Sequence, residues 1–202
     1  MKTLPPGPHL DLLMEALDAE AGAQRALLAR EPDTARHMFE AAERRYRASY
    51  ECAPPASYGR LIGMLKAAVL AGDPADSAAY VRDALRDVEL TPPACYASAI
   101  AALVAGDDAA AIEAAAGMRA GDAAFGRAAD AVAALATRDR EAYAAACHAI
   151  VADFETRTAH LTGVPIADTA AMFEVLAGER GIACSPESAL MPGGEAAATT
   201  NP

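Results

Sequence analysis

The sequence predicts an all-α protein built from stacked antiparallel helical hairpins, with about nine helices. Its large apolar residues recur with a period of 3.6 in nearly every segment, and no segment shows the sustained alternation of a strand. Apolar residues make up 53% of the 202 residues but aromatic residues only 5%, because alanine supplies much of the rest. Alanine has the highest helix propensity, so this composition favours helices over disorder.

Stripes of apolar residues mark the expected helices in order along the chain. They lie within residues 10–28, 38–50, 58–69, 81–88, 96–103, 143–154 and 166–177. Leucines dominate the first stripe, whereas Phe39, Tyr46 and Tyr50 dominate the second. Each stripe can bury only one face, so the helices must pack on one another, and short connections make neighbouring helices antiparallel.

Turn signals predict where several helices begin and end. In Asp73-Pro74 and in Thr91-Pro92 a capping side chain precedes a proline, which predicts helix starts near residues 73 and 92. A Gly-Val-Pro sequence at residues 163–165 is expected to break a long helix that begins near Asp139.

The helical periodicity fades after Gly181, and this change predicts the domain organisation. We expect one all-helical repeat domain over residues 1–182. Residues 183–202 are expected to form a short extended segment followed by a flexible tail, because Gly193-Gly194 precedes a run without large apolar residues.

Short phrases recur along the chain. Ala71-Gly72-Asp73, Ala105-Gly106-Asp107 and Thr137-Arg138-Asp139 follow one another at steps of 34 and 32 residues, and each closes one helix and opens the next. A Pro-Pro-Ala phrase ending in tyrosine occurs at residues 54–58 and again at 92–96, where it is expected to open a helix. Recurrence at this period is typical of stacked helical hairpins.

The spacing of Ala35, Phe39 and Ala42 resembles the second helix of a tetratricopeptide repeat, and Gly72-Asp73 followed by Ala84-Leu85 resembles its turn and closing small residue. The resemblance covers roughly residues 30 to 160. The first helix lacks the tryptophan and the Gly-Tyr pair of that family. The resemblance implies a tetratricopeptide-like solenoid or bundle that binds a peptide or a protein.

The C-terminal part, residues 166–193, resembles the closing segment of helical immunity proteins of bacterial polymorphic toxins. Arg180-Gly181 and Met191-Pro192 are the matching elements, and they are short. This second resemblance implies a cytoplasmic protein that binds and neutralises a cognate toxin.

Charge and cysteine spacing exclude several classes of protein. The net charge of -11 and the pI of about 4.7 disfavour nucleic acid as a partner. No apolar run reaches the ~18 residues that would span a membrane. Four widely spaced cysteines, expected to be small buried residues, indicate a reducing cytoplasm and no metal site. They are Cys52, Cys95, Cys147 and Cys184.

Catalytic and cofactor motifs are missing from the sequence. The four histidines stand singly, without the spacing of zinc or di-iron ligands, and no glycine-rich phosphate loop occurs. Cys147 and His148 are adjacent, but neighbours on a helix point about 100° apart. We therefore expect a protein that is not an enzyme and that has no catalytic residue, cofactor or metal ligand. The histidines are His9, His37, His148 and His160.

The expected function is binding of a protein, because stacked hairpins present an extended concave surface. Arg60, Lys66 and Asp130 are expected to face outward from the first helices. The second helices add an acidic series that would steer a basic partner. That series is Asp76, Asp83, Asp87, Glu89, Asp108 and Glu113. A toxin-neutralising immunity protein and a tetratricopeptide-like adaptor both remain open, as does the choice between an open solenoid and a closed bundle.

Overall fold

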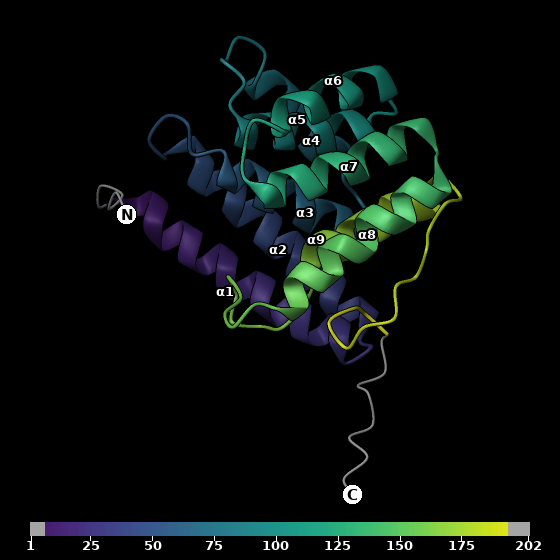
Figure 1. Ribbon diagram of the computed structural model, residues 1–202. Coiled ribbons are helices and arrows are strands. Elements are labelled where there is room, and N and C mark those ends of the chain that lie inside the picture. The colour runs from purple at the N-terminus through teal and green to yellow at the C-terminus, as the bar shows by residue number, and fades with distance from the viewer. Residues whose placement is uncertain (1–6, 194–202) are drawn as a thin grey trace, which may run out of the picture.

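The computed structural model describes residues 7–193, and this part of the chain is helical without a strand (Figure 1). The predicted fold class is confirmed. The nine helices of the described part are α1 (Pro8–Leu28), α2 (Pro32–Glu51), α3 (Gly59–Ala71), α4 (Ala75–Ala84), α5 (Pro92–Val104), α6 (Asp108–Met118), α7 (Ala123–Thr137), α8 (Arg140–Glu155) and α9 (Asp168–Glu179).

Consecutive helices pack on one another through most of the chain. The long helices α1 and α2 form the first pair, and α2 packs on α3. Further along, α5 packs on α6, α6 on α7 and α7 on α8, while α3, α5 and α7 also contact one another in that order. These three helices therefore form an inner row, as stacked hairpins require (Figure 1).

Helix α9 covers the inner row. It contacts α3, α7 and α8, and Met172, Phe173 and Leu176 on it are completely buried. The Phe173 ring lies 6.4 Å from the ring of Tyr96 on α5, centroid to centroid. The row of α3, α5 and α7 is thus closed over by the C-terminal helix instead of forming an open groove along its length.

Alanine and glycine allow the helices to approach closely. Alanines from most of the helices belong to one continuous core, many of them with no exposed surface. At Gly63 on α3, an added Cβ would lie 2.7 Å from the Tyr46 ring of α2, and at Gly117 on α6 it would lie 2.5 Å from the Cys95 sulfur of α5. Such distances leave no room for a side chain, so these glycines fix the spacing of the α2–α3 and α5–α6 pairs.

The three repeated turns have the same geometry, as the sequence predicted. Gly72, Gly106 and Arg138 all adopt the left-handed conformation that ends a helix. In each turn the following aspartate N–H donates to an alanine carbonyl five residues earlier. Asp107 and Asp139 then cap the next helix, because their carboxylates accept from a backbone N–H three residues on.

Two predicted helix starts differ in detail from the structure. Helix α4 begins at Ala75, with Pro74 rather than Asp73 at the N-cap position. Helix α5 begins at Pro92 as predicted, but Thr91 makes no capping hydrogen bond through its side chain. Two successive prolines remove the first two N–H groups of α5, so fewer backbone donors are left for the Thr91 hydroxyl to accept from.

Two other sequence interpretations are wrong. The Pro-Pro-Ala phrase opens α5, but the copy at residues 54–58 lies in the loop before α3, where Ala56 has a φ of 64°. Helix α8 starts after Asp139 as predicted but ends at Glu155, well before the break expected at residues 163–165. Between Phe154 and Val164 no side chain is fully buried, and Leu161 is 83% exposed, so there is no apolar face to extend α8.

The C-terminal segment, residues 183–193, has no helix but packs on the helical body. The Leu190 carbonyl accepts from the Ala167 N–H at 2.9 Å, and the Ser188 hydroxyl donates to Glu155 at 2.7 Å. Met191 is buried in the same core as Ile182. The tail predicted beyond residue 193 lies outside the described residues. Within residues 7–193 no helix has the length and apolar character needed to cross a membrane.

Candidate functional site

The structure corrects the predicted outward positions of Arg60 and Lys66. Arg60 is only 5% exposed; its Nε donates to the Ser49 Oγ at 2.7 Å, and a terminal guanidinium nitrogen lies 3.0 Å from the His9 Nδ1. Ser49 in turn donates to the His9 carbonyl at 2.7 Å. Burial lowers the pKa of Arg60. Arg60 thus joins α3 to α2 and to the start of α1, and it is not available to a partner.

Lys66 lies inside the molecule and joins α3 to α9. Its ammonium group pairs with Asp168 and also donates to the Thr169 Oγ1 at 3.3 Å. The two charged side chains are 13% and 16% exposed. Burial alone would lower the pKa of Lys66, but Asp168, Tyr96 and Glu20 outweigh it and raise that pKa, so the ammonium stays charged.

A polar cluster extends from this ion pair to α1 and α2. The Tyr46 hydroxyl and the Gln24 amide both donate to the carboxylate of Glu20, which is 3% exposed. Thr162, in the loop after α8, donates to Gln24. Burial raises the pKa of Glu20, although the charge of Lys66 opposes this shift. Burial and the Glu20 carboxylate likewise raise the pKa of the Tyr46 hydroxyl.

We expect Glu20→Gln to stabilise the protein at high pH. Because the pKa of Glu20 is higher in the folded than in the unfolded chain, the folded chain holds more protons above pH 4.5, and the free energy of unfolding falls as the pH rises through the folded pKa. Glutamine has no proton to lose and can still accept from Tyr46. Urea unfolding at pH 8 should show a gain on the order of 1 kcal/mol, which disappears near pH 4.5.

Glu15→Gln is the matched control, since Glu15 lies on the same helix with its side chain 53% exposed and paired with Arg45. We expect it to change the free energy of unfolding by less than about 0.5 kcal/mol at either pH. Equal pH dependence of the Glu20 variant and the native protein would contradict the assignment of this effect to Glu20.

The predicted acidic residues lie mainly at the surface. Asp76, Asp83, Asp87 and Glu113 are exposed, and so is Glu89. We call these five residues the acidic surface. They belong to α4, the connection after it and α6, and both helices pack on α5.

The other two predicted acids are engaged within the fold. Asp108 is partly buried; it pairs with Arg138 at 2.7 Å and with Arg180 at 3.8 Å. Asp130 is exposed but pairs with Arg119 at 2.6 Å. Both ion pairs join one helix to a residue beyond the next turn or helix end, so we do not include these two acids in the acidic surface.

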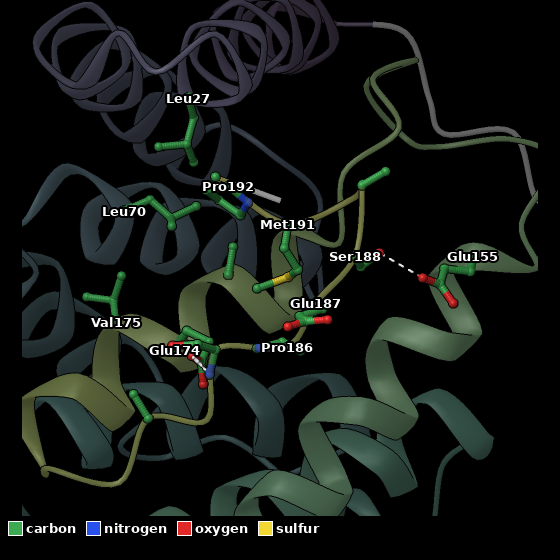
Figure 2. Close-up of a pocket in the computed structure, with 15 residues that line it drawn as sticks. Leu27, Leu70, Glu155, Glu174, Val175, Pro186, Glu187, Ser188, Met191 and Pro192 are labelled. Atoms are coloured by element: carbon green, nitrogen blue, oxygen red, sulfur yellow. Dashed lines mark hydrogen bonds between the residues drawn. The ribbon is translucent and has the colours of Figure 1, made fainter. Parts of the chain in front are cut away.

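A large cavity of about 1130 Å³ lies between the C-terminal segment and the helices beneath it (Figure 2). Leu27 of α1, Leu70 of α3 and Val175 of α9 supply apolar walls, and Met191 closes one side (Figure 2). Three carboxylates, from Glu155, Glu174 and Glu187, also line it. We call it the C-terminal cavity; the sequence does not predict it, because its walls come from distant parts of the chain.

Glu174 connects this cavity to two cysteines. Its Oε1 accepts from the Tyr143 hydroxyl at 2.7 Å and lies 3.4 Å from the Cys184 sulfur, and Cys147 lies beside them. Burial, together with the Glu174 carboxylate, raises the pKa of the Cys147 and Cys184 thiols. We call Cys147, Glu174 and Cys184 the Cys–Glu cluster.

A second, smaller cavity of about 210 Å³ lies beside α9 and is lined by aromatic rings. Tyr96 and Phe125 pack edge to face within its wall, and Phe154 lies on another side. At its rim Asp153 pairs with both Arg127 and Arg157. Partial burial alone would raise the pKa of Asp153, but the two guanidinium groups outweigh it and hold that pKa below its usual value. We call this the aromatic cavity.

The cysteines and histidines depart in part from the expected placement. Cys95 and Cys147 are buried as predicted, whereas Cys52 is exposed and Cys184 is partly exposed. His148 is exposed and bonds only to a backbone carbonyl of its own helix, and His160 stacks on Phe154. Within residues 7–193 neither histidine has a thiol or a carboxylate as a hydrogen-bond partner.

Comparison with known proteins identifies no relative: no protein family, curated protein or solved structure matches the chain.

Proposed function

We propose that the protein is a non-enzymatic binding module that recognises a protein with a basic surface, and that this partner is a toxin which it neutralises. The observation that carries the proposal is the acidic surface. Between residues 73 and 122 the chain has nine acidic residues and three arginines. A net negative charge of this kind accelerates encounter with a basic partner.

The closed inner row supports a partner that docks on the outside of the helices. Because α9 covers α3 and α7, the area open to a large partner lies on the outer helices, where the acidic surface is found. The toxin part of the proposal rests in addition on the resemblance of Arg180-Gly181 and Met191-Pro192 to immunity proteins.

A peptide-binding adaptor is the second candidate, and the aromatic cavity favours it. A cavity of about 210 Å³ has room for one apolar side chain, and the rings of Tyr96, Phe125 and Phe154 would contact it. Binding of this kind depends on apolar contact and should survive high salt, whereas binding to the acidic surface should not.

Charge neutralisation on the acidic surface tests the first candidate. We expect the triple variant Asp76→Asn, Asp83→Asn, Asp87→Asn to lower the association rate with the basic partner by about tenfold, because exposed charges act mainly on encounter. The assay is co-expression with a candidate basic toxin whose growth inhibition the native protein relieves: the native protein should restore growth and the variant should not. Association rates of the purified pair should also fall steeply with added salt.

The control is a second triple variant with the same change in net charge, Asp11→Asn, Asp18→Asn, Asp33→Asn, on α1 and α2. All three residues are exposed. The two variants also match in ion pairs, because the control removes the pair of Asp33 with Arg36 and the test variant removes the pair of Asp83 with Arg86. We expect the control to protect as well as the native protein does. Equal loss in both variants would reject the acidic surface as the binding site, and a partner held at 1 M salt would favour the adaptor.

A further inference from the structure

The Cys–Glu cluster brings together three ligand groups from three parts of the fold. Cys147 comes from α8, Glu174 from α9, and Cys184 from the chain just after α9. Their two sulfur atoms and a carboxylate oxygen all lie within 4.8 Å of one another. We propose that this cluster binds a zinc ion, in addition to the binding of a protein partner and independently of it.

The distance between the Cys184 sulfur and the Glu174 Oε1 agrees with a tetrahedral zinc centre. Zinc binds thiolate sulfur at about 2.3 Å and carboxylate oxygen at about 2.1 Å, so a sulfur and an oxygen on one ion lie about 3.6 Å apart. The Cys184 sulfur lies 3.4 Å from the Glu174 Oε1. An ion can therefore enter with little movement of these two side chains.

Binding replaces protons and involves no change of oxidation state. In the metal-free cluster the Cys184 thiol donates to the Glu174 Oε1. As the ion enters, Cys147 and Cys184 each lose a proton to solvent and form a zinc–sulfur bond, and the freed lone pair of Oε1 forms the zinc–oxygen bond. Two protons leave for each ion bound, and the ion takes the place of the thiol hydrogen bond.

Further hydrogen bonds hold the carboxylate in the orientation that a metal requires. The Tyr143 hydroxyl donates to Oε1, and the backbone N–H groups of Cys184 and Ser185 donate to Oε1 at 3.1 Å and to Oε2 at 2.7 Å. Partners of this kind fix the ligands of metal centres. Two thiolates select zinc over magnesium or calcium, which prefer oxygen ligands.

The fourth ligand of the ion is a water molecule. Glu174 and Ser185 line the C-terminal cavity, so the cluster lies at its wall and solvent reaches it from there. Three protein ligands with an open fourth position are the arrangement of zinc sites that exchange a ligand.

Cobalt titration of the reduced, tag-free protein tests the proposal. Cobalt occupies zinc sites and gives a thiolate charge-transfer band in the near ultraviolet. We expect one equivalent of Co²⁺ to saturate this band, Zn²⁺ to remove it, and excess Zn²⁺ to raise the melting temperature by about 5 °C or more. No thiolate band, or no thermal shift with Zn²⁺, would overturn the proposal, and neither measurement depends on a variant that folds.

Matched cysteine variants locate the ion. Cys184→Ser and Glu174→Gln should weaken Zn²⁺ binding at least tenfold and remove the thermal shift, and circular dichroism should show that the helices persist. Cys52→Ser and Cys95→Ser, which change the two cysteines outside the cluster, should leave both readouts unchanged. A band that persists in Cys184→Ser or disappears in Cys52→Ser would place the ion elsewhere and overturn the assignment.

Discussion

Phe173→Ala should destabilise the protein by about 3–5 kcal/mol, because it removes a large, completely buried ring and leaves a cavity. Phe173 lies at the centre of α9, and its ring packs near the ring of Tyr96 on α5, the middle helix of the inner row. The loss corresponds to a fall in melting temperature of about 6–20 °C for a chain of this length. Urea unfolding followed by circular dichroism measures it.

Val175→Ala is the control on the same helix. Val175 is 38% exposed, and alanine has the higher helix propensity, so we expect a change within about 0.5 kcal/mol. A similarly small effect of Phe173→Ala would mean that α9 does not cover the inner row in solution, and the open groove expected for a solenoid would then become available.

The buried ion pair between α3 and α9 should give the second large effect. Lys66→Met leaves Asp168 buried without its partner, and Asp168→Asn does the same to Lys66. Each single change should cost about 3–5 kcal/mol, because an isolated buried charge has lost its solvation without compensation. Lys66→Met also removes the charge that opposes the raised pKa of Glu20.

The double variant should be more stable than either single variant. With methionine and asparagine at the two positions neither member of the pair is left buried without its partner, and replacing a whole buried pair is often neutral. We expect the double variant to lie within about 1–2 kcal/mol of the native protein, giving a coupling energy of several kcal/mol in a double-mutant cycle. Additive losses would show that Lys66 and Asp168 do not pair in solution.

The sequence was sufficient to predict what depends on neighbouring residues. The period of 3.6 identified Phe39, Leu61 and Ile100 as core residues, and all three are completely buried. The repeated turn phrases predicted that helices end at Gly72 and Gly106, and both glycines adopt the left-handed conformation that commonly follows a helix.

The sequence was not sufficient where distant segments meet. Arg60 and Lys66 lie off the apolar stripe of α3, and a hairpin alone would leave them in water. In the folded chain they are covered by α1 and α9, which lie about 50 and 100 residues away in sequence. The same holds for Cys147, Glu174 and Cys184, whose spacing resembles no metal motif and whose contact depends on the return of the chain after α9.

The burial of Lys66 has a practical consequence for capturing a partner. Lys66 is the only lysine in the part of the chain that the structure describes, and its amine is committed to Asp168 and Thr169. Amine-directed reagents therefore find no free lysine on the surface of residues 7–193. Carboxylates are abundant there, so carbodiimide coupling should join the exposed aspartates of residues 7–193 to lysines of a basic partner.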